Sequence, residues 1–288
     1  MRRDDQRQAV KNIPLEQLKP FKNHPFQVRD DEEFRRLVES IEIHGVIHPA
    51  VARQIGEDCY ELISGHRRKA ACEVLGYSEM PVLVRSMTDD EAVVNMVDAN
   101  LQRETILPSE RAFAYKMKLD AMKRQAGRPS KENVSQVGTQ KRSDQLLAEQ
   151  VGQSRNQIQR YIRLTELIPE LMDMVDEKKI ALNPAYELSF LKKEEQVDLL
   201  DAMDSEQATP SLSQAQRLKK YSQEGHLTLD MMRVIMGEEK KSDLDRVTFT
   251  SDTLRKYFPK SYTPQRMQET IIKLLEAWQK KRQRDQER

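Results

Sequence analysis

The stretch Ile63-Ser64-Gly65-His66-Arg67-Arg68-Lys69-Ala70-Ala71 decides the fold of the first part of the chain, because an apolar strand pattern runs directly into a helix pattern there. A glycine at such a junction lets the backbone come close to a ligand. The first turn of the following helix presents free N–H groups, and three basic side chains add positive charge at the same end. The pattern predicts an anion-binding pocket with phosphate as its ligand. On residue types alone, a solvated basic first turn is the alternative.

Further strand and helix patterns surround this junction. Apolar residues predict a hairpin from residues 49–53 and 59–63 and another strand at residues 80–85. Residues 31–44 repeat apolar side chains at helical spacing and stop at Gly45, which predicts an amphipathic helix. Thr88 and Glu91 have the spacing of a capping box that starts the next helix. We therefore expect a small α+β domain over residues 1–103.

Composition and charge limit the remaining possibilities. The chain has 288 residues, 38% hydrophobic and 33% charged, enough for two or three helix-rich domains. Its first residues lack an apolar segment, and no stretch has the pattern of a membrane span, so we expect a cytoplasmic protein. The net charge of +1 hides an asymmetry, since residues 100–165 hold 13 Lys and Arg against 6 Asp and Glu, whereas residues 166–210 hold 4 against 12. The first of these segments attracts polyanions.

A helix-turn-helix pattern lies within the basic segment. Residues 144–164 place small and apolar side chains before Gly152, a capping Ser154 after it, and a buried face at Ile158, Tyr161 and Ile162. Arginine, asparagine and glutamine on the outer face of the second helix are the side chains that contact guanine and adenine edges. The predicted DNA-binding residues are Lys141, Arg142, Ser154, Arg155, Asn156, Gln157, Gln159 and Arg160. An ordinary helical hairpin with a polar face is the alternative.

The rest of the chain is predicted to be mainly helical. We expect a helical DNA-binding domain over residues 104–208 and a further region over residues 209–288. Residues 264–288 form one helix pattern with an apolar stripe, which indicates self-association or packing against its own domain.

Three motifs in this order make the chain resemble the ParB/Spo0J/RepB partition-protein family over residues 12–171. They are Gly45-Val46-Ile47-His48-Pro49-Ala50-Val51, then Gly65-His66-Arg67-Arg68-Lys69-Ala70-Ala71, and then Asn100-Leu101-Gln102-Arg103. The helix-turn-helix pattern then matches the family's reader of a palindromic, centromere-like site.

The resemblance implies a ParB/sulfiredoxin-like fold and a CTP-dependent dimeric DNA clamp that supports segregation of a chromosome, plasmid or mobile element. CTP would bind with Mg²⁺ at Gly45, Gly65, His66, Arg67, Arg68, Asn100 and Arg103, with Asn100 approaching the metal. A homodimer, a palindromic double-stranded DNA site, a ParA-type partner ATPase and a place on the nucleoid or a plasmid are also implied.

Two departures from the family pattern concern hydrolysis. Family motifs often carry glutamate where this chain has His66, and usually Glu-Asn where it has Ala99-Asn100. Asp98 is the remaining candidate acid, but one residue along a helix turns its direction by about 100°. We therefore expect CTP binding with weak or absent hydrolysis.

Two other classes of protein compete with this interpretation. A helix-turn-helix regulator whose first domain only dimerises needs no phosphate pocket. A sulfiredoxin-type enzyme needs a reactive thiol beside its His-Arg pair, and the stretch Ser64-Gly65-His66-Arg67 contains none.

Overall fold

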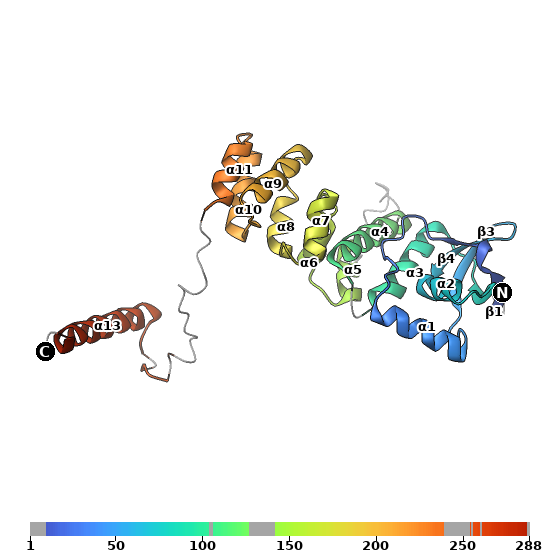
Figure 1. Cartoon of the computed structure of the whole chain (residues 1–288), viewed down its shortest axis with the longest axis horizontal. Helices are drawn as coiled ribbons and strands as arrows, with labels where there is room; N and C mark the ends of the chain where they lie inside the picture. Colours follow the sequence, from blue (N-terminus) through green and yellow to red (C-terminus); the bar gives the residue numbers. More distant parts are fainter. Residues whose placement is uncertain are drawn as a thin grey trace, which may run out of the picture. The chain divides into compact units, whose positions relative to one another are not determined.

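The computed structural model describes residues 10–103, 106–126, 142–238, 254, 256–259 and 261–286. Within them the first domain is built on a five-stranded mixed sheet in the order β1-β5-β3-β4-β2. Figure 1 shows this domain in blue and green. Its strands are β1 (Val10–Pro14), β2 (Leu18–Pro20), β3 (Ala50–Gly56), β4 (Cys59–Ser64) and β5 (Glu79–Val84), with a 3₁₀ turn, η1 (Leu15–Gln17), between the first two. Strands β3 and β4 pair antiparallel and β3 and β5 parallel, so the predicted hairpin and the α+β fold are confirmed.

Helices cover both faces of this sheet because side chains alternate along each strand. Leu62 packs with α1 (Glu32–His44) and α2 (His66–Val74), whereas its neighbour Ile63 packs with α3 (Asp89–Leu101) on the opposite face. Asp31 caps α1 by accepting a hydrogen bond from the Phe34 amide at 2.7 Å, and Gly45 ends that helix at a φ of 68°. Both features follow the sequence pattern.

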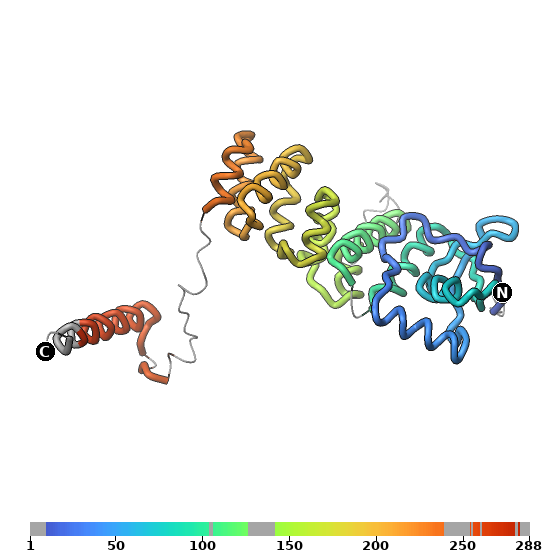
Figure 2. The backbone as a smooth tube through the Cα atoms, in the orientation of Figure 1, coloured from blue at the N-terminus to red at the C-terminus, as the bar shows by residue number. Residues whose placement is uncertain are grey.

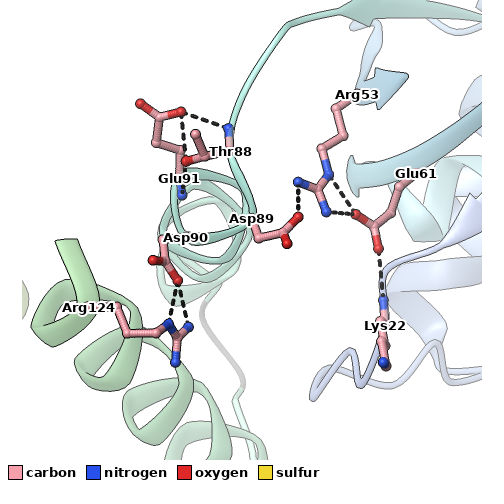
Figure 3. A network of polar contacts seen from close by, with 8 residues as sticks. All are labelled: Lys22, Arg53, Glu61, Thr88, Asp89, Asp90, Glu91 and Arg124. Atoms are coloured by element: carbon pink, nitrogen blue, oxygen red, sulfur yellow. Dashed lines mark hydrogen bonds and ion pairs between the residues drawn. The ribbon is translucent and has the colours of Figure 1, made fainter. Parts of the chain in front are cut away.

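The start of α3 is fixed by the polar network in Figure 3. Thr88 and Glu91 form the predicted capping box. Arg53 on β3 pairs with Glu61 at 2.7 Å and with Asp89, the first residue of α3, at 2.6 Å. The network therefore ties α3 to the sheet.

Helix α4 (Pro108–Ala126) carries the chain to the predicted helix-turn-helix, which consists of α5 (Ser143–Val151) and α6 (Arg155–Leu164). Leu147 and Ile158 are fully buried against Tyr115 and Leu119 of α4. Gly152 ends α5 in the left-handed conformation at a φ of 65°, which permits the turn. Helix-turn-helix geometry is thus confirmed.

Five further helices share one hydrophobic core, and Figure 2 shows them as successive neighbouring coils from yellow to orange. They are α7 (Pro169–Asp176), α8 (Leu182–Leu188), α9 (Lys193–Ser205), α10 (Leu212–Gln223) and α11 (Leu229–Met236). By compactness the chain divides between Glu238 and Glu239. The domain boundaries expected at residues 103 and 208 stay predictions.

The second compact unit contains α13 (Pro264–Gln286). Met267 is buried in this unit, whereas Leu274, Leu275 and Trp278 are each more than half exposed. No helix within the described ranges combines the length and apolar character needed to cross a bilayer.

Candidate functional site

The junction between β4 and α2 has the geometry that the sequence predicts. Gly65 lies between the two elements at a φ of 104°, and a Cβ atom there would lie 2.8 Å from the Cβ of Ala50. A side chain at this position would therefore be both strained and in collision. No side chain caps α2, so its first-turn amides remain available as hydrogen-bond donors.

Two arginines lie near each other at this junction. Arg67 pairs with Asp31 at 2.8 Å and with Glu33 at 3.1 Å, both at the start of α1. The Arg103 guanidinium lies over the ring of Phe26, 5.6 Å from its centre. Burial lowers the pKa of Arg103, and repulsion from Arg67 lowers it further. Two mutually repelling guanidinium groups favour an anion between them, and the carboxylates of α1 supply part of that charge.

His66, the first residue of α2, stacks on His24 with the ring centres 3.8 Å apart. Its Nε2 atom accepts a hydrogen bond from the Phe21 amide at 3.4 Å, and His24 Nδ1 donates to the Phe26 carbonyl at 2.7 Å. Burial lowers the pKa of His66 to about 3, with smaller contributions from His24, Arg103 and Lys69. His66 is therefore neutral near pH 7 and adds no charge to the junction.

The other predicted nucleotide-binding residues make different contacts. Arg68 donates to the carbonyl of His48 and, at 2.9 Å, to that of Pro49, so it braces the loop before β3. Burial lowers its pKa. Asn100 is buried and its Nδ2 donates to the Met96 carbonyl one turn earlier at 2.8 Å. The structure thus brings His66, Arg67 and Arg103 together, while Arg68 and Asn100 bind backbone carbonyls.

Sequence reasoning missed the residues that surround these cations. Asp31 and Glu33 are recognisable locally as the acidic first turn of α1, but nothing near them in the sequence shows that they contact Arg67. His24 comes from a loop without regular structure, for which no periodic signal exists.

Asp98, the candidate catalytic acid, is held by Lys118 of α4 at 2.5 Å. Its side chain is 51% exposed, whereas that of Lys118 is only 1% exposed. Asp98 lines a cleft of about 370 Å³ between α3, α4 and α5, together with Leu101, Gln102, Arg111, Tyr115, Gln150, Val151 and Gln153. Among the described residues, no group of three His, Cys, Asp or Glu side chains is arranged to hold a metal ion.

The predicted reading helix presents a polar face. Ser154 caps α6 by accepting a hydrogen bond from the Gln157 amide at 3.2 Å. Arg155, Asn156, Gln159 and Arg160 are exposed together with Ser154 and with Arg142 before α5, whereas Gln157 is half-buried. Lys141 lies outside the described residues.

The two exposed arginines of α6 are each held by a neighbouring helix. Arg160 donates to Asn183 of α8 at 3.3 Å and lies over the Tyr186 ring, 5.7 Å from its centre. Arg155 donates through Nε to Asp144 of α5 at 2.6 Å. Both side chains are therefore oriented before any ligand binds.

Helix α4 connects the loop before α1 to the end of the predicted reading helix. At its start, Glu110 accepts hydrogen bonds from Arg29 at 2.7 Å and from the Gln27 amide at 3.0 Å, in the loop that leads to α1. Further along α4, Lys116 donates to Thr165 at 3.0 Å, at the end of α6. A shift of α4 would therefore move both the loop before α1 and the end of α6.

These features define a two-part architecture, in which a small α+β domain with a cationic strand-to-helix junction is joined to a helix-turn-helix unit. The chain belongs to the ParB family: the model of the ParB N-terminal domain matches residues 1–101 and that of the ParB HTH domain matches residues 135–211.

The chain is also similar to a curated relative and to two solved structures. The nucleoid occlusion protein of Listeria monocytogenes serotype 4b (strain CLIP80459) is 32% identical over 189 residues, which are 66% of this chain and 60% of the relative. The chain thus spans about 60% of the length of this curated relative. Truncated ParB of Caulobacter crescentus bound to the centromeric parS site has 18% identity, a TM-score of 0.42, and coverage of 78% of this chain and 98% of that one. The same protein with CTP-γ-S has 21% identity, a TM-score of 0.31, and coverage of 68% and 99%.

Proposed function

We propose that this chain is a DNA-binding partition protein that acts as a CTP-gated dimeric clamp. It loads at a palindromic, centromere-like site, works with a ParA-type ATPase, and supports segregation of a chromosome, plasmid or mobile element. It associates with the nucleoid or a plasmid through its DNA. Membership of the ParB family supports the general role.

The observation that supports the proposal is the series of contacts that runs from the loop beside the cationic junction, through α4, to the predicted reading helix. Arg67 and Arg103 repel each other near the uncapped start of α2, and α4 joins the neighbouring loop of residues 27–29 to the end of α6 through Glu110 and Lys116. A nucleotide that binds one arrangement of α4 better than another changes the population of both.

The residues present fit a nucleoside triphosphate. No side chain caps the start of α2 after Gly65, so the first-turn backbone amides would donate to phosphate oxygens. Arg67 and Arg103 would bind the triphosphate, Gly45 and His66 would shape the pocket, and Arg68 would brace the loop beside it. Asn100 would offer its amide oxygen to Mg²⁺. The bound nucleotide would replace the carboxylates of Asp31 and Glu33 as the anion beside Arg67.

A second candidate function is a helix-turn-helix regulator without nucleotide switching. The ion pairs from Arg67 to Asp31 and Glu33 favour it, because they neutralise the cation on which phosphate binding depends. In the clamp, the nucleotide displaces these carboxylates. In the regulator, they hold α1 against α2 permanently.

Binding of the four nucleoside triphosphates with Mg²⁺, measured calorimetrically on the full chain, tests the proposal. We expect selective CTP binding that falls at least tenfold in Arg67→Ala, equivalent to about 1.4 kcal/mol. Arg36→Ala is the matched control, because Arg36 is an exposed arginine of α1 paired only with Glu32 of its own helix in the described contacts. Phosphate release measured in parallel should be slow, because His66 and Ala99 stand where the family motifs that the chain resembles often carry glutamate.

Two results would argue against the clamp. Equal loss of CTP binding in Arg36→Ala would mean that general positive charge, and not the pocket, attracts the nucleotide. Absence of nucleotide binding, with and without DNA, would favour the regulator.

A further inference from the structure

Helix α5 carries a buried carboxylate next to the reading helix. The Asp144 side chain is 7% exposed, and its Oδ2 accepts a hydrogen bond from Arg155 Nε at 2.6 Å. Its Oδ1 lies 3.4 Å from Nε of Arg142, an ion pair without hydrogen-bond geometry. One acid thus contacts two of the residues that the sequence predicts to bind DNA.

This arrangement is costly for a DNA-binding surface. A carboxylate near phosphates weakens binding to every DNA sequence, because it repels the backbone. A first-turn acid also favours its own helix, but an exposed acid would do so equally well. The burial of Asp144 and its hydrogen bond to Arg155, the first residue of α6, indicate another structural role.

The hydrogen bond to Asp144 uses Nε of Arg155 and leaves the two terminal nitrogens of the guanidinium group free of it. Asp144 engages Nε, while the side chain as a whole is 51% exposed, so the terminal nitrogens remain able to donate in parallel. Such a pair of donors matches the O6 and N7 acceptors of guanine. Fixing the guanidinium in advance lowers the entropy lost on binding.

We propose that Asp144 is a positioning residue for sequence reading, whose carboxylate holds Arg155 so that its terminal nitrogens address a guanine in the major groove. This inference rests on the proposed DNA binding.

The unmodified full chain (the parent) is first used to select its preferred DNA duplex from a random library, and this duplex is the probe. Affinity is then measured for the selected duplex and for a shuffled duplex of the same length, with the parent, Asp144→Asn, Arg155→Ala and the double variant. In Asp144→Asn we expect affinity for the selected duplex to fall about 5- to 150-fold, the range of about 1–3 kcal/mol for loss of one guanine contact. Affinity for the shuffled duplex should stay constant or rise, because a negative charge is removed. In the Arg155→Ala background, Asp144→Asn should cause no further loss of discrimination.

Glu149→Gln is the matched control, since it removes one negative charge from an exposed position of the same helix and should keep discrimination. If Asp144→Asn fails to fold, Arg155→Lys keeps the charge, removes the paired donors and should lose discrimination to the same extent. Unchanged discrimination in Asp144→Asn, or in Arg155→Lys, would overturn the inference while leaving DNA binding intact. A parent that selects no sequence would instead overturn the proposed function.

Discussion

His66 shows how one substitution changes the chemistry of a junction. A glutamate at this position would bring a negative charge to a helix start, whereas the imidazole is neutral and stacked on His24. Because Nε2 accepts a hydrogen bond from the Phe21 amide and the ring stacks on His24, the side chain stabilises the loop of residues 21–26.

The lowered pKa of His66 predicts acid sensitivity. In the unfolded chain its pKa is 6.5 and in the folded protein it is about 3, so the unfolded state binds the extra proton between these values. Stability is therefore full above pH 6.5 and falls as the pH decreases towards 3, by roughly 2 kcal/mol at pH 5 from this group. Urea denaturation at pH 8 and pH 5 measures the difference, which should shrink by about that amount in His66→Gln.

His226→Gln is the control for that prediction, because His226 is an exposed histidine elsewhere in the same compact unit. If the change in pH lowers the free energy of unfolding equally in the unmodified protein and in His66→Gln, burial does not lower the pKa of His66.

Helix α4 packs against α3 of the α+β domain and against α6 of the helix-turn-helix. One ion pair joins α4 to α3. Lys118 is buried, and Asp98 is the carboxylate within reach of its ammonium group in the described contacts. Asp98→Ala leaves a buried charge without its partner, so we expect a loss of about 2–3 kcal/mol in the free energy of unfolding. Lys118→Met alone should cost less than about 1 kcal/mol, and in that background Asp98→Ala should be nearly neutral, as a double-mutant cycle by chemical denaturation would show.

Asp120→Ala on α4 provides the comparison, because Asp120 pairs with Lys123 at the surface at 3.7 Å and should contribute less than about 0.5 kcal/mol. If Asp98→Ala is as mild as Asp120→Ala, the pair with Lys118 is not structural, and Asp98 regains its place as a candidate acid for hydrolysis.

Elements with local causes were predictable from the sequence. The capping box at Thr88, the left-handed turn at Gly152 and the strand-to-helix junction at Gly65 each depend on residues within a few positions of one another. Contacts between distant residues were not, because periodicity carries no information about which surfaces meet. Arg67 was predicted as a phosphate ligand without its carboxylate partners, and Arg155 as an outward-facing reader without its bond to Asp144.

At the scale of the whole molecule, the exposed apolar side chains of α13 bear on the proposed dimer. Ile272 is 48% exposed, Leu275 58% and Trp278 59%, a pattern that is unfavourable in water unless another surface covers it. In the proposed dimer a second copy of α13 would provide that surface, since a closed twofold pair buries the same stripe on both chains.

Leu275→Asp tests this inference, because a carboxylate buried without a partner should weaken dimerisation at least 100-fold, or about 3 kcal/mol. Sedimentation equilibrium on the full chain measures the dissociation constant, with Gln279→Asp as the control at an exposed polar position of the same helix. A palindromic duplex offers two half-sites to a dimer, so the Leu275→Asp variant should also lose affinity for two half-sites while keeping its affinity for one. A parent that sediments as a monomer at all concentrations, or a Leu275→Asp variant that dimerises as the parent does, would show that α13 is not the dimer interface. In either case a clamp would have to close through the α+β domain alone.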